Sequence, residues 1–192
     1  MRFRNETRGS LAAALVPNNT TLANDLGLIA IGAAATAAAA QIQIPWQPVP
    51  FTMQTLAVAL CGLALGSRRG ALAQLACLGG GAAGLPVFAE GRSGLATLAG
   101  PTGGFLIAFV ASAWLLGRLS DIRLDRRPFF LAAGLVLSNL AVFGLGWLWL
   151  SRHLGSGPAF QLGVAPFVAS ELLKDAMVLL GLYGTRAAFG RE

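Results

Sequence analysis

Apolar residues fill six long stretches of this chain, and short segments rich in proline, glycine or arginine separate them. A helix needs roughly 20 residues to cross a bilayer, and several stretches are somewhat shorter. We expect residues at their ends to extend them. The pattern predicts an all-α integral membrane protein with six transmembrane helices, at about 26–44, 51–66, 71–84, 105–119, 129–150 and 164–182.

Composition agrees with a membrane location. Of the 192 residues 55% are hydrophobic and only 11% are charged, whereas a soluble domain carries roughly a quarter charged residues. The mean hydropathy is +0.67. The net charge of +6 does not indicate nucleic-acid binding, because the arginines fall at the expected membrane edges. Cys61 and Cys77 lie in apolar segments, where free, buried thiols are expected.

The distribution of arginine predicts the orientation. When the loops are assigned alternately to the two sides, only Arg92 and Arg152 fall on one side, and all the other arginines fall on the opposite side, including Arg68, Arg69 and Arg118. Positively charged loops stay in the cytoplasm. We therefore predict a multi-pass protein of the cell (inner) membrane with both termini cytoplasmic: an N-terminal arm, a six-helix membrane domain and a C-terminal tail, at residues 1–21, 22–184 and 185–192.

Several chemistries lack the residues they need. Lys174 is the single lysine and no Gly-x-x-x-x-Gly precedes it, so the chain contains no P-loop for ATP. His153 is the single histidine, which argues against histidine-rich metal sites and a catalytic triad. We predict no catalytic residue, no cofactor and no metal.

Three charges interrupt the last apolar stretch. Glu171, Lys174 and Asp175 lie at helical spacings of i, i+3 and i+4, so they share one broad face. Charges at membrane depth are costly and usually face a wet cavity or the protein interior, which makes them candidates for a functional site. The alternative is a self-neutralising pair that only holds helices together.

Two loops predicted on the outer side are candidates for lids over such a site. One is the uncharged, proline-rich segment 45–50. The other is the long segment Gly84–Gly104, which carries only two charges, Glu90 and Arg92. A structureless loop of this length in a compact chain is typical of a binding loop. Because Glu171 and Lys174 lie in the outer half of their helix, we expect a pocket that opens outward.

Five sequence blocks resemble the BioY family, the biotin-specific substrate-binding (S) subunits of energy-coupling factor (ECF) transporters. They occur in one order over about residues 47–182, and the combination of the third and fourth is the most specific. The blocks are Pro-Val-Pro-Phe-Thr-Met-Gln-Thr (48–55), Leu-Gly-Ser-Arg-Arg-Gly (65–70), Gly-Leu-Pro-Val-Phe-Ala (84–89), Gly-Pro-Thr-Gly-Gly (100–104) and Gly-Leu-Gly-Trp-Leu (144–148).

The resemblance implies high-affinity capture of biotin from the extracellular or periplasmic side. It also implies delivery inward with a transmembrane coupling (T) subunit and two ABC-type ATPase subunits. Arg92 and Lys174 match family residues, and Glu171 stands where the family usually has aspartate. We expect Glu171 and Lys174 to bind the ureido group and Arg92 to bind the tail carboxylate. Trp46 and Phe88 are candidates for packing on the thiophane ring, and the alanine-rich first helix for docking the T subunit.

Three other functions remain open from the residues alone. The nearest alternative is a related S subunit that binds another vitamin. An intramembrane enzyme would use Glu171 and Asp175 as an acid–base pair, although Lys174 lies between them in sequence. An ion channel or proton relay would need charges on other helices, and few are present.

Overall fold

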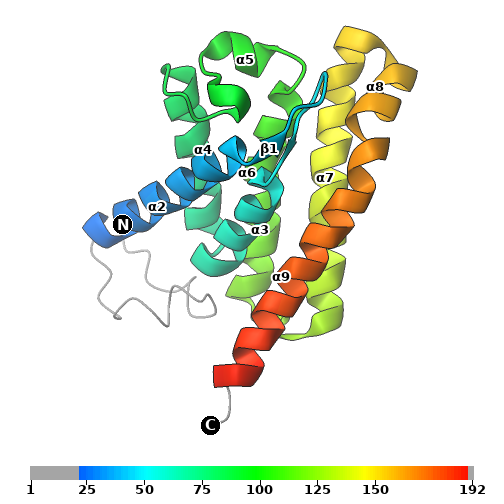
Figure 1. Ribbon diagram of the computed structural model, residues 1–192. Helices are drawn as coiled ribbons and strands as arrows, with labels where there is room; N and C mark the ends of the chain where they lie inside the picture. Colours follow the sequence, from blue (N-terminus) through cyan, green and yellow to red (C-terminus); the bar gives the residue numbers. More distant parts are fainter. Residues whose placement is uncertain (1–21, 190–192) are drawn as a thin grey trace.

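The computed structural model describes residues 22–189, and side chains up to residue 184. It is a helical bundle in which each predicted apolar stretch overlaps one long helix (Figure 1). These helices are α2 (Leu22–Gln41), α3 (Gln54–Leu65), α4 (Ser67–Ala82), α6 (Gly103–Asp121), α7 (Pro128–Leu154) and α9 (Val168–Phe189). The predicted arm, 1–21, lies outside the described residues.

Helix α6 forms the centre of the bundle and packs against α3, α4 and α7. Small residues allow this close approach. A Cβ atom added at Gly117 of α6 would collide with the backbone of Ser67, and one at Gly62 of α3 would collide with the backbone of Ala113. Two apolar clusters fill the space around α6. One surrounds Phe105 and Phe109 near one end of the helix, and the other surrounds Leu116 near the opposite end.

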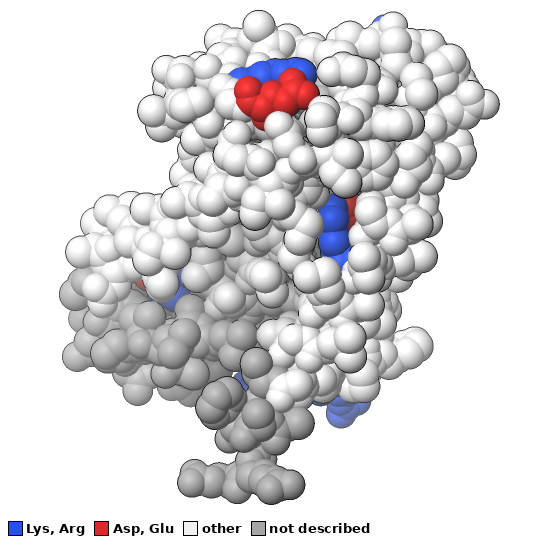
Figure 2. Space-filling view, in the orientation of Figure 1, with Lys and Arg blue, Asp and Glu red and all other residues white. Residues whose placement is uncertain are grey.

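The outer surface of the bundle is largely apolar. Large side chains such as Phe129 (76% exposed) and Leu180 (75% exposed) face outward, and charged atoms are sparse on the face shown in Figure 2. Extended exposed apolar surface is typical of membrane or protein contact. Within the described residues, α2, α6 and α7 are long and apolar enough to span a membrane, and α3 is a shorter apolar helix.

The first and last helices differ from the predicted ranges. Helix α2 ends at Gln41 rather than Ile44, because Gln43–Ile44 (β1) pairs antiparallel with Phe51–Thr52 (β2). The predicted last helix at 164–182 is interrupted: α8 (Ser156–Gly163) and the 3-10 turn η3 (Ala165–Phe167), which contains Pro166, precede α9. Proline favours a helix start over a helix interior. The first five residues of the predicted tail, 185–189, continue α9.

The segment Gly84–Gly104 is not structureless, which corrects the sequence prediction. It contains the 3-10 turn η1 (Ala89–Gly91) and the short helix α5 (Leu95–Ala99). Another 3-10 turn, η2 (Leu124–Arg126), joins α6 to α7 at the other end of the bundle. The segment Gly84–Gly104 therefore forms a folded cap on the bundle. The cap lies at the same end of the bundle as α8 (Figure 1).

Arg69 is not a loop arginine, although the sequence pattern placed it in a basic turn. The turn is a single residue, Gly66, with φ of 84°, so α4 already begins at Ser67. This places Arg69 inside the bundle, 5% exposed, where its guanidinium forms an ion pair with Asp25 of α2. The pair joins α2 to α4.

Candidate functional site

A cavity lies between the folded cap and the upper halves of α6, α7 and α9. Its empty volume is about 670 Å³, including space that opens to solvent, which is within the usual range for small-molecule sites. Segments far apart in sequence form its walls. They are Val49, Pro50, Thr52, Gln54, Thr55, Phe88, Ala89, Arg92, Thr97, Thr102, Phe105, Leu106, Phe109, Val142, Phe143, Phe167 and Glu171.

Most of the wall is apolar. Phe105, Leu106 and Phe109 come from α6, which places them along one side of its first two turns, and Phe88 enters from the cap and is only 2% exposed. Phe51 stacks on Phe167 with ring centroids 4.1 Å apart, which joins β2 to η3, the turn just before α9. Such a wall favours an apolar ligand body, and a few polar groups would fix its orientation.

Glu171 supplies the buried charge of the wall. It lies in the first turn of α9, is 5% exposed and accepts a hydrogen bond from the Thr55 hydroxyl at 3.0 Å. The Lys174 ammonium donates to the same carboxylate oxygen, Oε1, at 2.6 Å. A carboxylate has about four acceptor positions, so Glu171 retains acceptor capacity toward the cavity.

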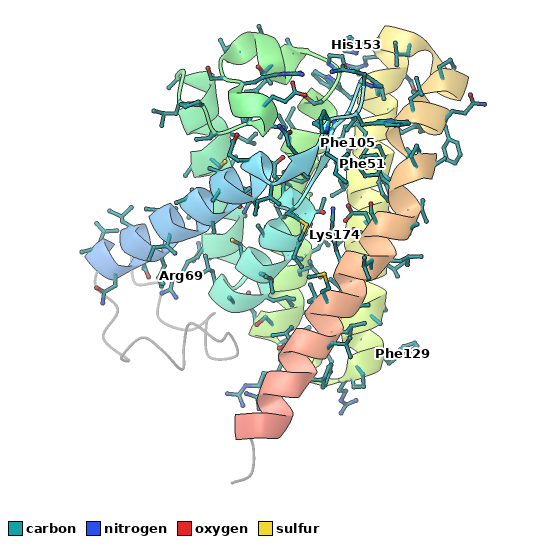
Figure 3. The ribbon with its side chains drawn as sticks, in the orientation of Figure 1. Phe51, Arg69, Phe105, Phe129, His153 and Lys174 are labelled. Atoms are coloured by element: carbon teal, nitrogen blue, oxygen red, sulfur yellow. The ribbon has the colours of Figure 1, made fainter. Side chains whose placement is uncertain are left out.

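Lys174 is turned away from the cavity wall and toward α3 and β2. Besides Glu171, its Nζ donates to the backbone oxygen of Thr52 at 2.7 Å and to the Thr55 hydroxyl at 2.9 Å. An ammonium group has three donors, and these three acceptors use all of them. Figure 3 shows Lys174 midway along the bundle, below Phe51 and Phe105. The predicted pair is thus present, but in this arrangement only Glu171 faces the cavity.

Arg92 contributes a cation to the cavity wall from the cap, just after η1. Its guanidinium forms an ion pair with Glu90, and its side chain is 41% exposed. Glu171 and Arg92 therefore line the same largely apolar cavity between cap and bundle. Phe88 lines the cavity, whereas Trp46 does not; it packs edge-on against Phe51 at 5.9 Å.

Asp175, the third charge of the last helix, does not line the cavity. It accepts a hydrogen bond from the Asn139 amide of α7 at 2.8 Å. Asp175 is therefore separated from the cavity in which an enzyme using Glu171 and Asp175 as an acid–base pair would bind its substrate. In the described part of the chain, no group of histidine, cysteine, aspartate and glutamate side chains is suited to a metal ion.

Sequence reasoning missed the polar residues at the end of β2 and the start of α3. Thr52, Gln54 and Thr55 all line the cavity, Gln54 is 4% exposed, and Thr55 bridges Glu171 and Lys174. Their signal was three polar side chains within four residues at the entry to an apolar helix. The sequence pattern instead indicated the proline-rich segment 45–50, just before them, as a candidate lid.

Comparison with known proteins decides the family. The model of the BioY family matches residues 10–191. The chain belongs to the BioY family. The "Probable biotin transporter BioY" of Pyrococcus horikoshii is 37% identical over 158 residues, which cover 82% of this chain and 93% of that protein. The "Biotin transporter BioY2" of Lactococcus lactis subsp. cremoris is 40% identical over 166 residues, with 84% and 90% covered.

A solved structure shares the fold. It is the S-component for biotin from an ECF-type ABC transporter, and it aligns with a TM-score of 0.75 at 24% identity, covering 88% of this chain and 95% of that one. The BioY match spans every residue that lines the cavity. The site described above therefore lies wholly within the part of the chain that is common to the family.

Proposed function

We propose that this BioY-family chain is the biotin-binding membrane subunit of an ECF transporter and that it performs no catalysis. It would capture biotin from the extracellular or periplasmic side and deliver it inward. The observation that carries the proposal is a buried carboxylate, Glu171, in the wall of a largely apolar cavity. The names of the relatives and the solved S-component support biotin as the ligand.

The ligand's chemistry matches the wall. The ureido ring of biotin offers two N–H donors and one carbonyl acceptor, and the rest of its bicyclic body is largely apolar. Glu171 would accept a ureido N–H with its remaining acceptor positions, and Phe88 would cover the thiophane ring. Because the donors of Lys174 are used by Thr52, Thr55 and Glu171, we propose that Lys174 chiefly orients this carboxylate. Direct donation from Lys174 to the ureido group stays a prediction.

The valeryl carboxylate of biotin would bind Arg92 at the rim. The planar guanidinium presents a fork of N–H donors that suits a carboxylate better than an ammonium does. Arg92 already lines the cavity, so no rearrangement of the cap is needed to bring it there. Its partial exposure keeps the tail end of the ligand close to the opening.

The proposal includes the predicted membrane arrangement. Helices α2, α3, α4, α6, α7 and α9 would span the inner membrane, with both termini cytoplasmic and 22–184 as the membrane domain. Since the chain contains no P-loop, energy would come from a T subunit and two ABC-type ATPase subunits. The small-residue face of α2, of which few residues are buried, is the surface proposed to dock the T subunit.

Equilibrium binding to the full chain purified in detergent tests the function. Radiolabelled biotin should bind tightly and in a one-to-one ratio, and Arg92→Gln should weaken binding by about tenfold, because charged hydrogen bonds are strong but this one is partly exposed. Arg152→Gln is the matched control, since Arg152 lies at the predicted outer side, packs over Trp149 and does not line the cavity. It should bind biotin like the unmodified chain.

Competition with other vitamins separates the alternatives. Excess unlabelled biotin should displace the label, and riboflavin or thiamine should not. Displacement by one of these vitamins at lower concentration than by biotin would favour an S subunit of different specificity. Absence of any biotin binding by the folded chain would overturn the proposed function.

A further inference from the structure

The cap holds an acid directly beside the cation proposed to bind the ligand. Glu90 forms an ion pair with Arg92 at the cavity rim, and the two side chains are 28% and 41% exposed. Arg92 lines the cavity, whereas Glu90 does not. Figure 2 shows the adjoining acidic and basic surface at the end of the molecule that carries the cap. The arginine therefore already has a carboxylate partner before any ligand arrives.

The backbone of the cap holds Glu90 in this position. Glu90 has φ of 61° and ψ of 24°, a left-handed conformation that is unusual for a residue with a side chain. Two hydrogen bonds close the segment around it: Phe88 N–H donates to the Arg92 oxygen at 3.1 Å, and Arg92 N–H donates to the Ala89 oxygen at 3.2 Å. The Gln41 amide of α2 donates to the Phe88 oxygen at 3.0 Å and fixes the turn to the bundle. Glu90 thus occupies a fixed place next to Arg92.

We propose that Glu90 is an intramolecular competitor of the ligand carboxylate for Arg92. This inference rests on the proposed function, in particular on a ligand with an anionic tail. In the empty site Glu90 pairs with Arg92; on binding, the tail carboxylate takes its place, and on release Glu90 returns. Glu90 thereby lowers the affinity for carboxylate ligands and speeds their dissociation, which suits a subunit that must give its ligand up.

The exposure of the pair sets the size of the effect. A partly exposed ion pair is weak because water screens both charges and the side chains must be ordered to form it. Exchange of one carboxylate for another at Arg92 is therefore inexpensive. We expect removal of the Glu90 charge to tighten biotin binding by about two- to fivefold, and to do so mainly through slower dissociation, as is usual for changes within one site.

A double-mutant cycle tests the competitor role. Glu90→Gln keeps the side-chain length and removes the charge. It should tighten biotin binding two- to fivefold and leave binding of biotinol, whose tail is an uncharged alcohol, unchanged. In the Arg92→Gln background the same change should have no effect on biotin, because the group being competed for is absent. The cycle also distinguishes competition from a general electrostatic effect. If Glu90 only repelled anions from the rim, its removal would tighten biotin binding in both backgrounds.

Each outcome bears on the inference. If Glu90→Gln tightens biotin binding equally with and without Arg92, or changes biotin and biotinol alike, Glu90 does not compete for Arg92 and the inference is wrong. Weaker biotin binding in Glu90→Gln would likewise overturn it, and would identify Glu90 as a support for Arg92 instead. In each of these cases the unmodified chain still binds biotin and the proposed function stands. If the unmodified chain does not bind biotin, both fail together.

Discussion

Two buried ion pairs of this protein look alike by charge and burial, and they differ in what surrounds them. Asp25 and Arg69, whose side chains are 8% and 6% exposed, connect α2 to α4. Glu171 and Lys174, at 6% and 11%, lie one turn apart on α9 and contact the start of α3 through Thr55. Both pairs carry the cost of taking charges out of water.

The cavity distinguishes them. Neither Asp25 nor Arg69 lines the cavity under the cap, whereas Glu171 forms part of its wall. Asp25 also lies in the first turn of α2, where the helix dipole favours an acid. We infer that the α2–α4 pair is structural and that the α9 pair orients a carboxylate for a ligand. A buried charge identifies a site only when a space adjoins it.

The largest effect on ligand binding should follow removal of the Glu171 carboxylate. Glu171→Ala deletes the acceptor in the cavity and leaves the Lys174 ammonium buried without its anion. Breaking a buried pair by removing one partner costs about 3–5 kcal/mol of folding stability. Because the acceptor for the ligand is lost as well, we expect biotin affinity to fall by roughly a hundredfold or more. Equilibrium binding measures the loss, and a melting curve in the same detergent checks that the variant is folded. Retention of affinity within about threefold in a folded variant would move the ligand away from Glu171.

The structural pair should show the opposite behaviour. Asp25→Ala leaves Arg69 buried without its partner, so we expect a loss of stability of about 3 kcal/mol. In a chain of this size that corresponds to a decrease of roughly 6–12 °C in apparent melting temperature. Biotin affinity, measured well below the transition, should not change.

A double variant sharpens this contrast. Asp25→Leu with Arg69→Met replaces both charges by apolar groups and should recover most of the lost stability, since a buried pair is often no better than an apolar contact. If Asp25→Ala instead weakened biotin binding while the melting temperature stayed the same, the α2–α4 pair would have to be counted as part of the binding machinery.

The sequence predicted the helical stretches and the α9 pair because both depend on local spacing. Apolar length indicates a helix, and the i, i+3 separation places Glu171 next to Lys174 whatever the rest of the chain does. The burial of Arg69 does not follow from local spacing. It depends on a one-residue turn at Gly66 and on α2 packing against α4, and a run of Ser-Arg-Arg-Gly is equally compatible with a surface loop.

The cap and the Thr55 bridge show the same limit. Glycines at 84, 91 and 94 adopt positive φ, and so many glycines concealed the short helix Leu95–Ala99 that follows them. Thr55 meets Glu171 across 116 positions of sequence, which no spacing pattern reveals. Local spacing indicates Glu171 and Lys174. Tertiary packing, which spacing does not reveal, adds Thr55 to the candidate site.

A smaller loss of biotin affinity than in Glu171→Ala should follow removal of the hydroxyl that connects the α9 pair to α3. Thr55→Val keeps the shape and removes a group that donates to Glu171 and accepts from Lys174. Hydrogen bonds to charged groups contribute about 1.5–3 kcal/mol to stability, but Thr55 acts on the ligand chiefly by holding Glu171 in place. We therefore expect biotin binding to weaken by about fivefold and Thr55→Ser to restore it. Thr97→Val is the matched control, because Thr97 also lines the cavity but its hydroxyl donates to the Ser93 backbone oxygen at 2.8 Å. Equal effects of the two valine variants would mean that the bridge to the ion pair contributes nothing to binding, and that Glu171 is held by Lys174 alone.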